Sequence, residues 1–349
     1  MNIFIPDLHS TLTYSFCKAF EGMGGVIYAP IPNKTNPTIM SGGEILLKSA
    51  ADFRWYGDHY KIPNVRFVEM TDLPDIDIDV VIMADTPLQR SVWRYLLPLF
   101  SRRKQVYVVA FCGNEMPRYR WDLVENLLCA DEKTWHARGS RVPNAIRYFP
   151  HVDYDSCVFN GCSDSNTLIT CINQFEKRYP QEAAWASQII KRLPTVDHQI
   201  IGGLAPYEVA THIQSCAASL HIKHEEGYGY SVIESLAMGR PIIAPRQYIQ
   251  GRTMARWCIH GESALLFNTT DEAVSLIRNF FEDAELRHRL QTKSAQLIRQ
   301  VIDNEEQTLA LKGFINRLQP QKHKRLINHL LDVRYRHSPQ KHHRTHAAP

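Results

Sequence analysis

Short apolar runs that alternate with helical patterns are the feature that most constrains the fold of this 349-residue chain. In the first half these runs lie at residues 2–5, 26–28, 79–83 and 106–111, with a helical pattern over 11–21. Uniformly apolar strands joined by helices are typical of a parallel sheet that is covered on both faces. The first half therefore predicts a doubly wound, Rossmann-like α/β lobe.

The same alternation resumes after a break at residues 147–153, where Pro150 disfavours helix in the residue before it. Strands are predicted at 167–171, 198–201, 218–222 and 241–244, and helices at 180–192, 206–216, 231–238, 271–281 and 284–303. The chain thus predicts two doubly wound lobes that face a cleft. We divide it into a first domain over 1–152, a second over 153–318, whose last helices are candidates to return to the first lobe, and a tail over 319–349.

Composition excludes several classes of protein. Hydrophobic residues at 44% and charged residues at 22% describe a globular chain rather than a disordered one. No run of about 18 apolar residues is present, and the short apolar start lacks a basic lead, so we expect a cytoplasmic protein. The eight cysteines are scattered, and only Cys157 and Cys162 lie close together, so we expect reduced thiols rather than a zinc site.

The net charge of +4 belongs to the tail. Residues 321–349 hold seven Lys or Arg against one acid, and six histidines, so that the rest of the chain carries about −2. Three interpretations stay open for this tail: a solubilising disordered segment, contact with anionic lipid, or contact with nucleic-acid phosphates. Either polyanion would place the protein at the periphery of a membrane or of nucleic acid.

The segment from 223 to 240 is the strongest candidate for a site. Its pattern is strand, loop, helix and a glycine stop, with Gly227 and Gly229 in the loop. Glycines let a ligand approach the backbone, and the N-terminus of the following helix favours a phosphate. The alternative is structural: Ser231 caps the helix, and Glu234 completes a capping box.

The sequence EGYGYSVIESLAMGRPIIA resembles the acid–seven residues–acid signature of the retaining GT-B glycosyltransferases, the glycogen-synthase-like family-4 group. Three further blocks occur in the order of that family: IIGG with APYE at 200–208, HGESALLF at 260–267 and EDAELR at 282–287. The resemblance covers about 100 residues of the second half, and the first half matches in architecture only. It implies two Rossmann-like lobes of GT-B type and a sugar-nucleotide donor in the second lobe.

The resemblance also implies roles for individual residues. Glu226 would contact the transferred sugar, and Glu234 would hold the ribose. The segment between them would line the sugar and diphosphate with Gly227, Tyr228, Gly229, Tyr230 and Ser231. A basic pair that clamps the diphosphate would be Lys177 and Arg178, although the family's glycine-arginine-leucine start is missing there; Lys223 is chemically suitable as well.

No metal or other cofactor is expected, since the family generally works without one. The acidic run Asp75, Asp77 and Asp79 precedes a first-lobe strand and is interpreted as a solvated turn rather than a metal motif. His224, beside the acidic motif, is interpreted as a packing or loop histidine.

Polar residues that follow first-lobe strands are candidates for the acceptor side, because ligands bind at the carboxyl ends of such strands. They are His9, Ser10, Asp85, Asn114 and Glu115. For Asp85, at the place where the family commonly has a histidine, catalysis and helix capping are equally good interpretations. The other four are open in the same way, with Ser10 a candidate helix cap.

These features predict a glycosyltransferase, a hexosyl- or pentosyltransferase, that moves a sugar from a nucleotide diphospho-sugar to an acceptor hydroxyl with retention. The expected acceptor is a glycan or a lipid carrier. Two alternatives stay open: glycosylation of a modified base in DNA, as phage enzymes perform, and a sugar-nucleotide-binding protein that has lost catalysis.

Overall fold

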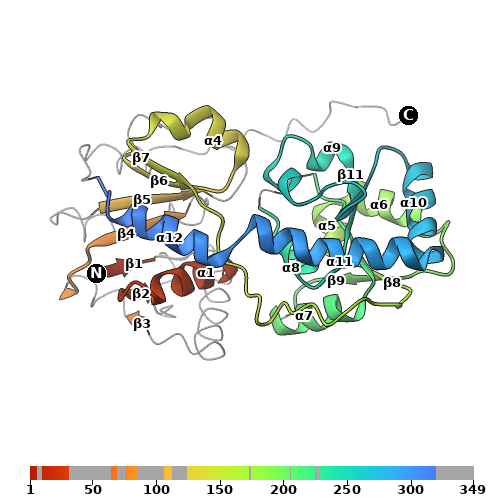
Figure 1. Ribbon diagram of the computed structural model, residues 1–349, viewed down its shortest axis with the longest axis horizontal. Coiled ribbons are helices and arrows are strands. Elements are labelled where there is room, and N and C mark those ends of the chain that lie inside the picture. Colours follow the sequence, from red (N-terminus) through yellow and green to blue (C-terminus); the bar gives the residue numbers. More distant parts are fainter. Residues whose placement is uncertain are drawn as a thin grey trace.

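The computed structural model describes residues 1–5, 10–30, 64–68, 72, 75–84, 106–111, 124–172, 174–204, 206–224, 226 and 228–319. These residues form two α/β lobes that lie side by side, each built on its own sheet (Figure 1). Every strand pair within the two sheets is parallel. The predicted pair of doubly wound lobes is therefore confirmed.

The first lobe has a seven-stranded sheet in the order β3-β2-β1-β4-β5-β6-β7. Its strands are β1 Asn2–Phe4, β2 Val26–Pro30, β3 Val65–Val68, β4 Val80–Ala84, β5 Val106–Phe111, β6 Asn126–Cys129 and β7 Asn144–Arg147. Its described helices are α1 Ser10–Glu21, α4 Glu132–Arg138 and the short 3-10 helix η3 Gly139–Arg141. The exposed Asp79 accepts a hydrogen bond from the Asn2 backbone at 2.7 Å, which fits a solvated turn before β4.

The second lobe has a five-stranded sheet in the order β12-β11-β10-β8-β9. Its strands are β8 Thr167–Cys171, β9 Asp197–Ile201, β10 Ala218–Leu220, β11 Ile242–Pro245 and β12 Ala264–Phe267. Its helices are α5 Phe175–Arg178, α6 Pro180–Ile190, α7 Pro206–Ser215, α8 Tyr230–Ala237, α9 Arg246–Ile249, η4 Thr253–Arg256, α10 Thr270–Glu282 and α11 Ala284–Val301. Helices α6 and α10 pack on one face of the sheet and α7, α8 and α11 on the other, so β10, β11 and β12 are buried throughout.

The strand order of the second sheet indicates where a ligand is expected to bind. In the second sheet, β8 comes first in the chain and lies between β9 and β10, so the connections leave it in opposite directions. Ligands of open parallel sheets bind at such a switch point, outside the carboxyl ends of the strands. The loops that follow β8 and β10 are therefore the expected place for a site.

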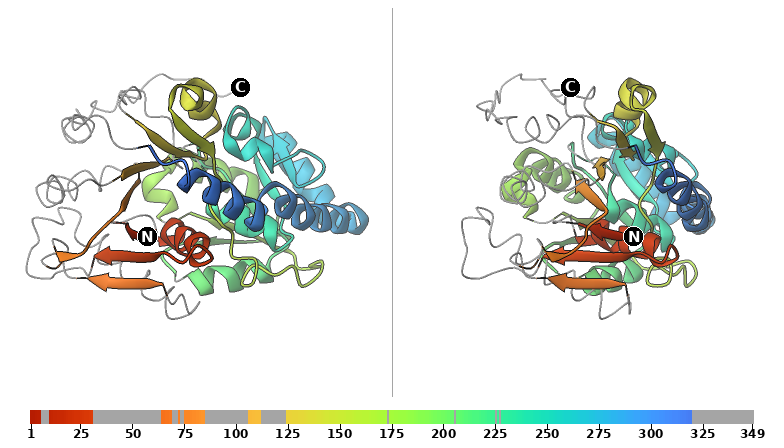
Figure 2. Two further views of the ribbon diagram at one scale, coloured as in Figure 1. Left: turned by 60° about the vertical axis from the view of Figure 1, so that its left-hand side comes forward. Right: turned by 90° about the vertical axis from the view of Figure 1, so that its left-hand side faces the viewer.

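The chain crosses between the lobes twice. The first crossing follows β7, and the second leads from α11 to α12 (Asn304–Ile315), which packs against α1 and β7 of the first lobe (Figure 2). Leu311 and Phe314 of α12 are buried in the first-lobe core. The side chain of Asn304 also bonds both backbone groups of Val152, so the two crossings are joined to each other.

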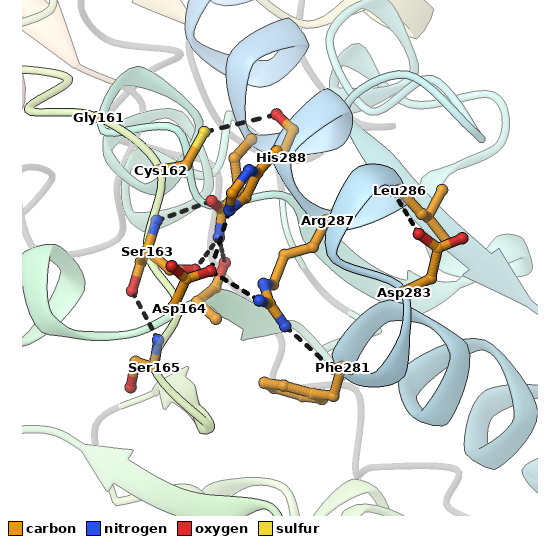
Figure 3. Close-up of polar contacts among 12 residues, drawn as sticks. Gly161, Cys162, Ser163, Asp164, Ser165, Phe281, Asp283, Leu286, Arg287 and His288 are labelled. Carbon is orange, nitrogen blue, oxygen red and sulfur yellow. Dashed lines mark hydrogen bonds and ion pairs between the residues drawn. The ribbon is translucent and has the colours of Figure 1, made fainter.

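The extended segment between the first crossing and β8 is bound to α11 (Figure 3). The carboxylate of Asp164 accepts hydrogen bonds from Arg287 at 2.7 Å and from His288 at 2.9 Å. The amide of Gln291 accepts from the Ser163 backbone N–H and donates to its carbonyl. These contacts fix the path by which the chain enters the second sheet.

The sequence pattern did not predict β3, β6, β7, β12 or α12. Strands β6 and β7 each hold a buried asparagine, a residue that is depleted in strands. Asn144 donates to Asn126 at 3.1 Å, and Asn126 donates to the Gln319 carbonyl at 2.8 Å. Tertiary hydrogen bonds thus outweigh the local preference.

The seven cysteines of the described residues are free thiols, as predicted. Among the helices that the structure describes, none has the length and apolar character needed to cross a bilayer.

Candidate active site

Glu226 lies in the loop between β10 and α8, beside the switch point of the second sheet. Its Oε2 atom is 2.6 Å from Lys223 Nζ and 4.0 Å from His221 Nε2. The side chains of Lys223 and Glu226 are 19% and 18% exposed, so the ion pair is largely shielded from water. A carboxylate held in this way has a fixed position, as a ligand site requires.

The turn from this loop into α8 depends on Gly229. Its φ is +72°, in the left-handed region that glycine adopts at little cost, and it is the N-cap of the helix. A Cβ at this position would lie 2.9 Å from Met254 Sδ. Since Gly229 makes no side-chain cap, the N-terminus of α8 is left to backbone groups and to any ligand.

The predicted capping box is wrong. The helix begins at Tyr230, one residue before Ser231, so Ser231 lies in the first turn. Glu234 then lies one turn inside the helix and makes no cap. Gly229, in the left-handed conformation, is the N-cap in place of a capping side chain. The spacing of Ser231 and Glu234 did not predict this.

Glu234 lies near the carboxyl end of β8 and near the first crossing. It interacts electrostatically with Cys171 at the end of β8 and with Asp153 and Cys157 of the crossing segment. Burial, with a smaller contribution from the carboxylate of Asp153, raises the pKa of Glu234 to about 7. The two acids of the motif therefore face two different parts of the site.

Arg178 and Lys223 both lie near the ring of Tyr179. The guanidinium of Arg178 lies 5.5 Å and the ammonium of Lys223 lies 5.7 Å from the centroid of that ring. Lys177, the other member of the predicted pair, is exposed on α5. The ring of Tyr179 thus joins the segment after β8 to Lys223 of the acidic loop.

Arg252 is a third cation at the site, and the sequence analysis missed it. It follows α9, and its guanidinium donates to the backbone carbonyl of Glu226 at 3.1 Å. The available signal was the pair Gly251-Arg252 after the strand that neighbours β10.

The aromatic side chain of Tyr228 joins the acidic loop to the first crossing. Its hydroxyl donates to the Pro150 carbonyl at 2.9 Å, and its buried ring packs against Phe149 and Trp257. Tyr230 packs edge-on against Tyr228, with ring centroids 5.0 Å apart. The side chain of Tyr228 is therefore structural, and only its backbone is left for the predicted ligand contact.

The residue after Arg252 contacts the first lobe directly. The buried hydroxyl of Thr253 accepts from the Glu132 N–H and donates to the Ala130 carbonyl, both at 3.0 Å. Arg256, one turn further, forms an ion pair with Glu132 at 3.6 Å. One short segment, residues 252–256, thus contacts both the acidic loop and the other lobe.

His224 is a packing residue, as predicted. Its Nδ1 pairs with Oε1 of the buried Glu182 on α6, and its ring lies edge-on to Tyr179.

Several predicted residues lie outside the described residues: His9, Asp85, Asn114, Glu115, Gly227 and the tail over 320–349. Ser10 is the first residue of α1, and its side chain lies outside the described part as well.

Residues 179–297 match the family model described as glycosyl transferases group 1. This chain is a glycosyltransferase. The matched segment runs from the end of α5 into α11 and includes Lys223, Glu226, Glu234 and Arg252. A comparison with curated proteins finds no match.

Solved structures show the fold of the whole enzyme. Sucrose-phosphate synthase from Thermosynechococcus elongatus is similar with a TM-score of 0.59 at 10% identity, over 91% of this chain and 99% of that one. A glycosyltransferase from Rickettsia africae gives 0.58 at 11% identity, over 95% and 99%. TarM of S. aureus, solved in complex with UDP among other ligands, gives 0.53 at 10%, over 68% and 55%. The two-lobed GT-B architecture is therefore confirmed.

Proposed function

We propose that the enzyme moves a sugar from a nucleotide diphospho-sugar to an acceptor hydroxyl with retention of the anomeric configuration. The observation that carries the proposal is the Glu226 carboxylate, held by Lys223 beside the switch point and in front of α8. A carboxylate in this place accepts hydrogen bonds from hydroxyls of the transferred sugar. The retaining family-4 resemblance of the sequence supports this assignment of Glu226.

The diphosphate of the donor fits the charges around this carboxylate. Lys223 lies in the acidic loop, Arg252 donates to the Glu226 carbonyl, and Arg178 at the end of α5 shares the Tyr179 ring with Lys223. Helix α8 begins at the end of the same loop and points its positive end there. The leaving nucleoside diphosphate gains negative charge in the transition state, and fixed positive charge stabilises it there. We expect no metal requirement, because these cations supply that charge. The complex of TarM with UDP supports a donor of this class.

Glu234 is proposed to hold the ribose. Its carboxyl group lies near the ends of β8 and of the crossing segment, where burial raises its pKa to about 7. Ribose hydroxyls would donate to this carboxylate and offset the loss of water around it.

The first lobe is proposed to supply the acceptor side through Asp85, His9, Ser10, Asn114 and Glu115. The acceptor would be a glycan or a lipid carrier, with the basic tail as a contact for anionic lipid headgroups.

A donor screen with product analysis tests the proposal. The purified protein is incubated with UDP-, GDP-, ADP- and dTDP-sugars of α configuration in EDTA, and the release of nucleoside diphosphate is measured. One donor is expected to turn over, and proton NMR of the product should show an α linkage. A β linkage would refute retention, and activity that disappears in EDTA would refute the metal-free site.

A further inference from the structure

His221 is a buried histidine next to the acid on which the proposed function depends. It follows β10 directly, its side chain is 5% exposed, and its Nε2 atom lies 4.0 Å from Glu226 Oε2. Among the residues that the structure describes, this buried nitrogen has no hydrogen-bond partner.

If His221 contributed only to the stability of the fold, this arrangement would be unfavourable. A buried polar atom without a partner costs about 1–3 kcal/mol, whereas an apolar side chain of similar size would remove that cost. The side chain of His221 is 5% exposed, so an apolar side chain of similar size would be buried at the same position. The imidazole therefore needs a reason other than packing.

The charge state of the imidazole fits a role as a neutral donor. Burial lowers the pKa of His221 to about 4, with Lys223 lowering it and Glu226 raising it. At neutral pH the ring is therefore uncharged and has one N–H to donate. The Glu226 oxygen that lies 4.0 Å from Nε2 is the same one that Lys223 Nζ contacts at 2.6 Å.

We propose that His221 is the positioning residue of Glu226, and that its Nε2–H replaces Lys223 as the partner of Oε2 when the donor binds. The donor's diphosphate draws the ammonium of Lys223 to itself, because it carries more charge than one carboxylate. Oε2 then moves about 1 Å to reach ordinary hydrogen-bond distance from Nε2. No proton is transferred, and the neutral imidazole leaves the carboxylate charged and aimed at the sugar. The inference rests on the proposed function.

Two substitutions distinguish a positioning role of His221 from a packing role. His221→Leu removes the donor and fills the same space, whereas His221→Gln keeps an N–H on a side chain of similar reach. We expect His221→Leu to lower kcat 10- to 100-fold, to change the donor KM less than threefold and to leave the melting temperature equal or higher. His221→Gln should recover at least a tenth of the wild-type kcat. An unchanged kcat in His221→Leu would overturn the proposal, as would equal losses in both variants together with lower melting temperatures.

Glu226→Gln, assayed in parallel, distinguishes a failure of this inference from a failure of the proposed function on which it rests. If Glu226→Gln turns over like the wild type, the proposed function of the site fails, and the role of His221 fails with it. If Glu226→Gln is inactive and His221→Leu is normal, only the inference about His221 fails.

Discussion

Glu226 and Glu234 are the same kind of residue in two electrostatic environments. Glu226 is paired with Lys223 in a loop, whereas Glu234 is enclosed by α8, the end of β8 and the carboxylate of Asp153. Burial raises the pKa of Glu234 to about 7. We therefore expect Glu234 to make the stability of the enzyme depend on pH.

Replacement of Glu234 by glutamine tests this expectation. The pKa of Glu234 rises from an ordinary 4.5 to about 7 in the folded chain, so the unfolded chain loses its proton first and stability falls as pH rises from 4.5 to 7. Glu234→Gln removes this loss and should be more stable than the wild type by about 2 kcal/mol at pH 8, after allowance for partial exposure, and equal to it near pH 4.5. Urea unfolding at both values measures the difference. Glu262→Gln, at an exposed loop position, serves as the control, and a difference independent of pH would contradict the assignment.

Site residues that lie close together in the sequence could be predicted. Site residues that only the fold brings together could not. Glu226, Glu234 and Lys223 belong to one short segment, so their spacing and chemistry could be interpreted together. His221 looks like the end of an apolar strand, and its relation to Glu226 depends on the path of the loop. Arg252 is 26 residues away from Glu226, and only the pairing of β10 with β11 brings it close.

Among the elements, η4 links the donor loop to the first lobe. Arg252 and Thr253 are adjacent, yet the first bonds the Glu226 carbonyl and the second bonds Ala130 and Glu132 of the other lobe. The contacts to the acidic loop and to the first lobe thus lie on adjacent residues.

Thr253→Val tests this link because it removes the hydroxyl and keeps the shape. It leaves a buried N–H and a buried carbonyl without their partner, at a cost of about 1–3 kcal/mol. The melting temperature should fall by about 2–6 °C, and the donor KM should rise several-fold. Thr253→Ser, which keeps the hydroxyl, should stay within 2 °C of the wild type in differential scanning calorimetry. Equal behaviour of the two variants would show that the hydroxyl does not join the lobes.

Elements with strong periodicity could be predicted, and those held by tertiary contacts could not. Strands β5 and β8 have the predicted bounds, because β5 is an apolar run and β8 consists of apolar and β-branched residues, which strands favour. Strands β6 and β7 were missed because their buried asparagines depend on each other and on the end of α12. The start of α8 was predicted one residue late because a glycine, not Ser231, is the N-cap.

The whole molecule is two sheets joined by two chain crossings and by side chains at the acidic loop. The aromatic group of Phe149, Tyr228 and Trp257 combines the first crossing with the second-lobe core. The two-lobed plan could be predicted from the alternation of strands and helices. The contacts between the lobes could not, because they pair residues that are about 80 to 160 positions apart.

Single-turnover release of nucleoside diphosphate from the donor found in the screen tests the central claim most directly. The wild type, Glu226→Gln and the control Glu262→Gln are mixed with saturating donor and acceptor, and the rate constant of the first turnover is measured. The account predicts a loss of about 10²–10³-fold for Glu226→Gln, because the variant loses a fixed charge at the reacting sugar, and no loss for Glu262→Gln. A Glu226→Gln rate within twofold of the wild type would contradict the assignment of the active site.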